Sequence, residues 1–107
     1  MIARIATFEG VNPTADTKLM ERAEEIVKPI MRGMTGFQGH LELMDQRSGK
    51  ALSISLFDTE ENALAAESTF DQELPKALGE IMEQWSGRRV SVDRYEVMAE
   101  DRIGTTV

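Results

Sequence analysis

The stretch GFQGHLELMDQRSGKALSISLF, residues 36–57, decides the fold. Hydrophobic and polar residues alternate on both sides of a polar, glycine-containing loop at residues 46–50. This pattern is typical of two antiparallel strands joined by a hairpin, and we expect the strands at residues 40–45 and 51–57. Because successive side chains of a strand point to opposite sides, each strand presents one set of side chains to a core and one set away from it.

The aliphatic set of these two strands is expected to face the core. This set contains Leu41, Leu43, Leu52, Ile54 and Leu56. The opposite face would carry His40, Glu42, Met44, Ser53, Ser55 and Phe57. One interpretation of this mixed face is that solvent covers it, as it can on one side of an antiparallel sheet. We favour the other, in which two copies pack sheet against sheet around a partly polar lumen and so protect their exposed sheet edges.

Helical periodicity appears on both sides of the hairpin. Apolar residues recur at steps of three and four from Leu19 to Met31, which predicts an amphipathic helix with Pro29 in its last turns, ending near Gly33 or Gly36. Asp58 is expected to cap a second helix. Continuity of that helix through residues 68–71 is doubtful, and a further helix is expected from Pro75, with a core stripe at Leu78, Ile81, Met82 and Trp85.

Strands are also expected at residues 2–9 and 88–98, although the sequence does not decide which residues of these strands face the helices. The resulting order, β-α-β-β-α-β, predicts a ferredoxin-like α+β domain with an antiparallel sheet and helices on one face. We expect a single domain over residues 1–98 and a C-terminal tail over residues 99–107. In a chain of 107 residues, a sizeable pocket should lie between elements or between subunits.

Composition excludes several classes of function. The net charge of −7 repels phosphate backbones and anionic membranes, so neither nucleic acid nor a membrane is expected as a partner. The chain has no cysteine, which excludes disulfides, zinc–thiolate sites and cysteine nucleophiles. The N-terminal residues do not read as a signal peptide and no apolar run reaches the ~20 residues of a membrane span, so we expect a cytoplasmic protein.

Few residues are candidates for chemistry. His40 is the only histidine, and an imidazole can act as a base toward a phenol or quinol, although a surface or cavity-lining role is the commoner one. Arg4 and Arg94 can bind a carboxylate or phenolate of a ligand, or instead pair with Glu42 or Glu96. Trp85 and Phe57 can stack on a flat ligand, or simply pack in a core. One histidine without cysteine gives no spacing for a metal site, and no metal is expected.

Two motifs resemble the antibiotic biosynthesis monooxygenase-like domains. These are Gly36-Phe37-Gln38-Gly39 leading into the strand from His40, and the stretch Phe57–Ala63 with its acidic residues. The resemblance covers nearly the whole chain in element order. It implies a homodimeric α+β barrel that binds a small aromatic or quinol-like molecule between sheet and helices, and in some members oxidises it with O₂ and no cofactor. A non-catalytic dimeric ligand-binding or interaction module remains the alternative.

The chain departs from the family pattern at several positions. Phe57 stands where the family often has Trp, and Ala66 and Glu67 stand where it often has His in the following helix. The family's haem-degrading members use an axial His there and an Asn on the first strand, and residues 2–9 contain no Asn. Haem degradation is therefore disfavoured, and no cofactor is expected. The polar residues of the oxygenases do not carry over position by position.

Overall fold

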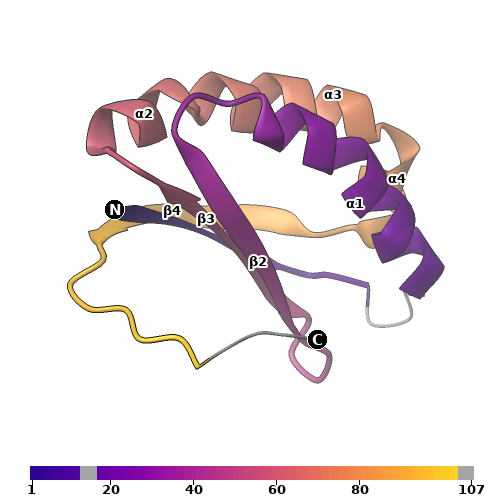
Figure 1. Cartoon of the computed structure of the whole chain (residues 1–107). Helices are drawn as coiled ribbons and strands as arrows, with labels where there is room; N and C mark the ends of the chain where they lie inside the picture. Colours follow the sequence, from indigo (N-terminus) through magenta and orange to yellow (C-terminus); the bar gives the residue numbers. More distant parts are fainter. Residues whose placement is uncertain (13–16, 104–107) are drawn as a thin grey trace.

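The structure, a computed structural model, describes residues 1–12 and 17–103. Its elements follow the expected order of strand, helix, hairpin, helical region and strand (Figure 1). In chain order they are β1 (Ile2–Glu9), α1 (Thr17–Arg32), β2 (Phe37–Asp45), β3 (Lys50–Phe57), α2 (Glu60–Ala65), the π-helical turn η1 (Thr69–Glu73), α3 (Leu74–Leu78), α4 (Glu80–Trp85) and β4 (Arg88–Glu96). The predicted ferredoxin-like α+β fold is confirmed.

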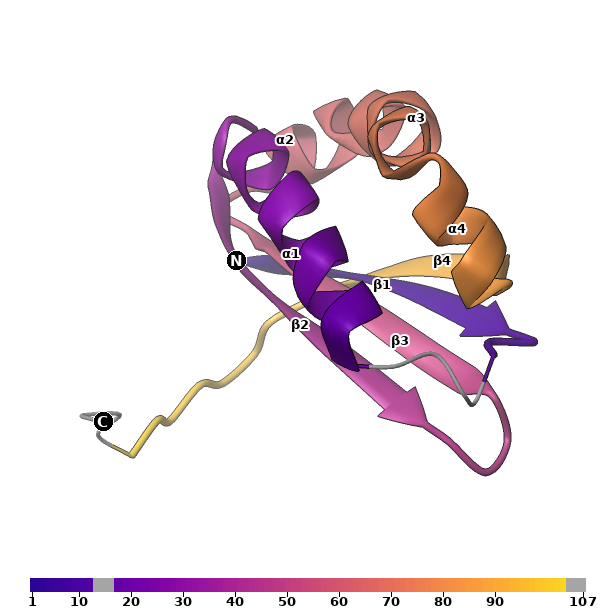
Figure 2. The same ribbon diagram turned by 90° about the vertical axis from the view of Figure 1, so that its right-hand side faces the viewer.

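The four strands form one antiparallel sheet in the order β2-β3-β1-β4, and all the helices lie on one face of it (Figures 1 and 2). The hairpin pairs β2 with β3, so that Glu42 lies opposite Ser53. β1 occupies the centre and pairs with β3 and β4. A change of register between Thr7 and Phe8 marks a bulge in the β1–β4 ladder. None of the helices within the described residues is long and apolar enough to cross a membrane.

The predicted first helix is present and continues through Pro29 as far as Arg32. The second helical region is broken into short pieces, as the doubtful continuity near residues 68–71 indicated, and a π-helical turn lies there. The prediction that Asp58 caps α2 is wrong. Thr59 is the N-cap, because its hydroxyl accepts a hydrogen bond from the Asn62 N–H at 3.2 Å.

The predicted orientation of the hairpin is wrong: its aliphatic set points away from the helices. Leu41 and Leu43 are 58% and 47% exposed, whereas Phe57 is completely buried. His40 contacts Glu24 of α1, so His40 and the alternate residues that share its face of the strand lie on the helix side. The inner set, which faces the helices, contains Arg4, Ala6, Phe8, His40, Glu42, Ser53, Ser55 and Phe57. The outer set contains Ile5, Leu41, Leu43, Leu52, Ile54, Leu56 and Tyr95.

The reason for the error is that both faces of the sheet carry apolar residues. Alternation separates two sets of side chains, but it does not say which set lies under the helices. The register shows which side chains of β1 face the helices, since Arg4 lies opposite Ser55 of β3 on one side and Arg94 of β4 on the other. Arg4 and Phe8 therefore share the inner face with Glu42. The polar residues thus face the inside of the subunit, and the uncovered face is largely aliphatic.

The core is concentrated at one end of the space between sheet and helices. Phe57 packs there against Ala63 and Ala66 of the helical region, with Phe37 and Phe70 around it. The rings of Phe37 and Phe70 meet the Phe57 ring edge to face, with centroids 5.9 and 6.4 Å away. Small alanines let the helix approach the large ring closely. The other end of the interlayer space is not filled in this way.

We predict that Gly36→Ala destabilises the protein by about 2 kcal/mol or more, which lowers the melting temperature by roughly 10 °C. Gly36 has φ +77°, and a Cβ atom there would lie 2.1 Å from Asp58 Oδ1 and 2.6 Å from Asn62 Nδ2. Gly33→Ala is the matched control, because its Cβ would meet only ordinary contacts at 3.4 Å or more. Equal melting temperatures for the two variants would contradict this reading of the turn.

Candidate functional site

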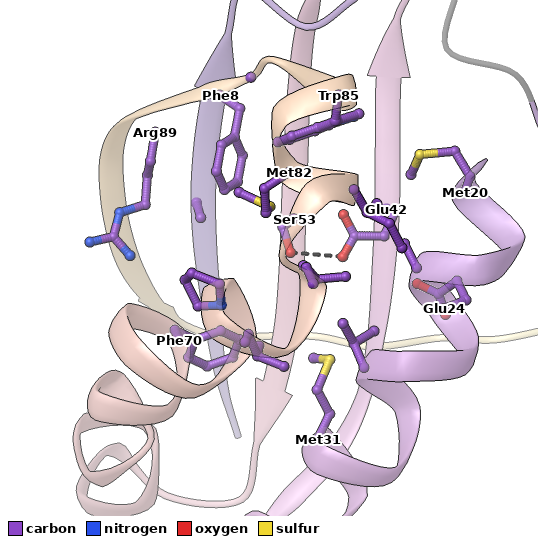
Figure 3. A pocket seen from close by; sticks show the side chains of 18 of the residues that line it. Phe8, Met20, Glu24, Met31, Glu42, Ser53, Phe70, Met82, Trp85 and Arg89 are labelled. Atoms are coloured by element: carbon purple, nitrogen blue, oxygen red, sulfur yellow. Dashed lines mark hydrogen bonds between the residues drawn. The ribbon is translucent and has the colours of Figure 1, made fainter.

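A cavity of about 300 Å³ lies between the sheet and the helices (Figure 3). Its wall is mostly apolar and includes an aromatic side chain at each end. Residues that line it come from the sheet (Arg4, Ala6, Phe8, Glu42, Ser53, Arg89), from α1 (Met20, Ala23, Glu24, Val27, Met31) and from the second helical region (Phe70, Asp71, Leu74, Pro75, Leu78, Ile81, Met82, Trp85), with Gly87 after it. A mainly hydrophobic hollow with a few polar groups is the usual form of a small-molecule site.

Two aromatic rings lie at one end of the cavity. Trp85, at the end of α4, meets Phe8 of β1 edge to face, with ring centroids 5.0 Å apart. Gly87 makes room for the indole, since a Cβ atom there would lie 2.5 Å from Trp85 Cζ3. The short helix and the glycine together hold the indole against the sheet.

At the other end, a buried ion pair supports the wall. Arg4 is 1% exposed, and its guanidinium donates from Nε to Glu67 Oε1 at 2.6 Å and from Nη2 to Glu67 Oε2 at 3.1 Å. Phe70 stacks on the same guanidinium, which lies 3.8 Å from the ring centroid. Arg94 Nη1 contributes a longer bond of 3.4 Å to Glu67 Oε1. Phe70 belongs to the π-helical turn, so this irregular turn sets where the ring meets the cavity.

A second ion pair joins the helical region to the outermost strand at the cavity wall. Arg89 Nη1 of β4 lies 2.7 Å from Asp71 Oδ1 of the π-helical turn. Both side chains are more than a third exposed, so solvent reaches this pair and its contribution to stability is small.

Glu42 is the acidic group of the cavity floor. Its carboxylate accepts a hydrogen bond of 2.8 Å from the Ser53 hydroxyl on the neighbouring strand (Figure 3). Because β2 is an edge strand, the residue as a whole is exposed, but its carboxyl group lies against the cavity wall. Desolvation of that group raises the pKa of Glu42 to about 7, while Ser53 and His40 lower it and Glu24 raises it by smaller amounts. At neutral pH this carboxyl group can therefore both accept and donate a proton.

His40 lies beside Glu42 but makes its hydrogen bonds with α1. Its Nε2 lies 2.9 Å from Glu24 Oε2 and 3.1 Å from Oε1. An ionised carboxylate only accepts hydrogen bonds, so Nε2–H is the donor and carries the proton. Within the described residues, Glu24, His40 and Glu42 each offer a ligand atom within 4.8 Å of the others. Since Nε2–H is engaged with the carboxylate, we interpret these three residues as a hydrogen-bonded cluster and not as a metal site.

The structure separates the residues that the sequence singled out. Arg4 and Trp85 line the cavity, whereas Arg94 reaches only Glu67 at its border. Phe57, expected to point away from the helices, lies in the core. His40 lines a second pocket and not the cavity. Glu67, and neither Glu42 nor Glu96, is the partner of both arginines.

Sequence reasoning missed Glu42, Ser53 and Glu24 as parts of the site. Glu42 and Ser53 belong to the alternating set that was expected on the outer face, so the wrong orientation removed them from consideration. Glu24 lies among the charged residues of α1 and shares no motif with the hairpin. The available signal was a glutamate and a serine at opposed positions of one hairpin, each flanked by leucine or isoleucine.

No protein-family model matches the sequence, and no curated protein shows significant similarity to it. Solved structures do match. The monooxygenase from the ActVA-Orf6 gene of Streptomyces coelicolor, in complex with the ligand nanaomycin D, matches with a TM-score of 0.68 at 17% identity, over 96% of this chain and 92% of that one. A dimeric ferredoxin-like protein from an uncultured marine organism matches with a TM-score of 0.70 at 11% identity, over 95% and 98%.

A protein assigned to the antibiotic biosynthesis monooxygenases, from Bordetella bronchiseptica, matches with a TM-score of 0.66 at 18% identity, over 92% of this chain and 97% of that one. The chain has the fold of the antibiotic biosynthesis monooxygenase-like proteins. The resemblance seen in the two sequence motifs is thus confirmed at the level of the fold. At these identities, the roles of individual residues must be argued from this chain alone.

We predict that the stability contributed by Glu42 depends on pH. Its pKa is raised from 4.5 to about 7 in the folded protein. The native state therefore binds more protons than the unfolded state between these values, and this contribution is complete below pH 4.5 and lost as pH rises through about 7. Relative to Glu42→Gln, which stays neutral, the wild-type melting temperature should fall as pH rises from 4.5 to 8.

Thermal unfolding of both proteins across this pH range measures the effect. Glu25→Gln, which changes an exposed carboxyl on α1, is the control, and its melting temperature should stay parallel to that of the wild type. A constant difference between wild type and Glu42→Gln at every pH would contradict the raised pKa.

Proposed function

We propose that the cavity binds a small aromatic molecule of the quinol or anthrone type and that Glu42 removes a proton from it, so that the electron-rich ring reacts with O₂ without a cofactor. The observation that carries this proposal is a carboxyl group with a pKa of about 7 in the wall of an apolar cavity of about 300 Å³. A base is most effective when its pKa is near the working pH.

The reaction requires little else from the protein. The O–H bond of the substrate breaks, its proton bonds to a Glu42 oxygen, and the electron pair stays on the substrate. The resulting anion is a better reductant for O₂. One oxygen atom enters the ring and the other leaves as water, so the substrate supplies all the electrons. Methionine, leucine and aromatic side chains around the ring hold it in place and exclude water from the intermediate.

Glu42 takes the role that the sequence suggested for His40. Glu42 lines the cavity, and its Ser53 bond fixes the direction of the carboxylate. His40 lines the second pocket instead. The Streptomyces coelicolor structure, a monooxygenase in complex with nanaomycin D, supports a small-molecule role for this fold.

The second candidate function is a dimeric module that binds such a molecule without transforming it. The pairing of Arg4 with Glu67 favours this alternative, because it neutralises a buried cation at the cavity that would otherwise stabilise a substrate anion. Binding and turnover can be measured separately, since Trp85 is the only tryptophan and lines the cavity.

We predict that the protein consumes O₂ with 1,8-dihydroxyanthrone or a member of a quinol panel, and that Glu42→Gln lowers kcat/KM by about 100-fold at pH 8. The rate of the wild type should rise as pH passes through about 7. An oxygen electrode measures turnover, and quenching of Trp85 fluorescence measures binding. Glu25→Gln, an exposed neighbour of the site, should behave as the wild type does.

Quenching of Trp85 without oxygen uptake across the panel would favour the binding module. An unchanged rate and pH profile in Glu42→Gln would remove Glu42 as the base while leaving the oxidation itself in place.

We also propose that the chain works as a homodimer whose aliphatic sheet faces pack together into an α+β barrel. The outer set of side chains supports this, because leucines on the exposed side of a four-stranded sheet form the kind of apolar patch that marks an interface. The interface would then be mainly aliphatic, with Asp93 of β4 as a charged residue on the same face, in contrast to the polar lumen expected from the sequence. The cavity lies on the other side of the sheet, away from this proposed interface.

We predict that Leu43→Lys raises the dimer dissociation constant by at least about 100-fold, because it places an unpaired charge in an apolar interface. Leu64→Lys on α2 is the control, since Leu43 and Leu64 are equally exposed, at 47% each. Leu41 is less suitable, because Asp93 lies in its row of the sheet and could pair with a new lysine. Sedimentation of wild type and Leu64→Lys as single 12.0 kDa particles at micromolar concentration would contradict the dimer.

A further inference from the structure

A second pocket, of about 400 Å³, lies where the end of α1 meets the start of β2. It takes no part in the proposed function. Two cationic side chains of α1, Lys28 and Arg32, line it beside Phe37, Gln38 and His40 of β2. The described residues that line this pocket include no acidic one, although the chain as a whole has a net charge of −7. The pocket is therefore a cationic hollow in an acidic protein.

The two cations of this pocket are free to bind an anion. Lys28 and Arg32 are both exposed and lie four residues apart, so they are neighbours on the surface of α1. Neither forms an ion pair with another described residue. Glu24 has the spacing to pair with Lys28, but its carboxylate instead contacts His40 Nε2 at 2.9 Å. Like charges at this spacing repel each other, and a bound anion would relieve that repulsion.

A bulge in β2 brings two rings to the same pocket. Gln38 is the extra residue of the β2–β3 ladder, between Phe37 and Gly39. In a regular strand, Phe37 and His40 would point to opposite faces of the sheet, and the extra residue turns both toward the helices. Their ring centroids are 6.2 Å apart, and the ring planes are tilted by 32°. The bulge thus adds a flat apolar surface to the cationic hollow.

We propose that the second pocket is a binding site for a small organic acid with a flat ring, of the aromatic carboxylate class. The carboxylate lies between Lys28 and Arg32, where a guanidinium can donate two parallel hydrogen bonds to it. The ring of the ligand lies against the rings of Phe37 and His40. The side-chain amide of Gln38, exposed at the bulge, is a further donor.

This site is distinct from the main cavity. Of the described residues that line the second pocket, Met31 alone also lines the cavity. The main cavity has an acidic group in Glu42, whereas the second pocket has two cations, so the two hollows select ligands of different charge. Binding at the second pocket requires neither Glu42 nor O₂. The inference therefore stands or falls independently of the proposed oxidation.

Two residues that occur once in the chain report on the two hollows separately. His40 is the only histidine and lines the second pocket, and Trp85 is the only tryptophan and lines the cavity. We expect 2-naphthoate, added at neutral pH, to shift the imidazole NMR signals of His40 in a saturable manner, and more weakly as salt is added. A shift of the Trp85 indole N–H signal with no change at His40 would overturn the proposal.

Charge variants locate the site. We expect the double variant Lys28→Gln, Arg32→Gln to raise the dissociation constant measured at His40 by at least about tenfold. Lys18→Gln with Arg22→Gln is the matched control, because it removes two exposed charges of the same spacing from the other end of α1, and it should bind as the wild type does. Equal weakening in both double variants would overturn the site, since it would show attraction to the surface in general.

The exchange Lys28→Arg, Arg32→Lys keeps both charges and should retain binding. If instead 2-naphthoate does not bind the wild type and Lys28→Gln, Arg32→Gln lowers the melting temperature, the two cations serve only to stabilise the end of α1, and the proposal is wrong.

Three further compounds separate the parts of the ligand. Acetate and inorganic phosphate carry charge without a ring, and neutral 2-naphthol carries a ring without charge. We expect each to act on the His40 signals at least about tenfold more weakly than 2-naphthoate. Acetate or phosphate binding as tightly as 2-naphthoate would overturn the aromatic class of the ligand. Equal binding of 2-naphthol would overturn the role of the two cations.

Discussion

The structure depends on one buried charge. Arg4 stands in the central strand with almost no exposure, and an ionised group in such a place needs a partner at good distance and geometry. Glu67 supplies it from the helical region with two hydrogen bonds, and Phe70 covers the guanidinium. The pair therefore joins the helical layer to the sheet at one point, beside the π-helical turn that carries Phe70. The cavity exists on one side of this anchor because the aromatic core fills the other.

Within the cavity, the balance between apolar wall and acidic floor determines the proton affinity of Glu42. A carboxyl group that kept its full hydration would stay ionised and be a weak base. Burial of the Glu42 carboxyl shifts it into the range where it exchanges protons at neutral pH, and the Ser53 bond and His40 oppose this shift only in part. The apolar wall that would hold a flat ring in the proposed function thus also raises the pKa of Glu42.

Much of the fold could be read from the sequence. The period of three and four in residues 19–31 and the alternation of the hairpin gave the right elements in the right order, since both patterns are local. The orientation of the hairpin could not be read, because the set with leucines is the natural choice for a core and here it lies on the uncovered side. This one error in the predicted orientation put Phe57 on the wrong face of the sheet. It also kept Glu42 from being considered as a site residue and left His40 as the candidate base. The partner of Arg4 was missed because Glu67 is 63 residues away.

Alternate residues of strand β2 face two different environments, and this affects how the protein can be modified. Even-numbered positions, such as His40 and Glu42, face the helices, and odd-numbered ones, such as Leu41 and Leu43, face the aliphatic exterior. The two sets share a backbone and point to opposite faces of the sheet. Variation at even positions can retune acidity or ligand preference while the exterior keeps its shape, so one strand can evolve along two independent lines.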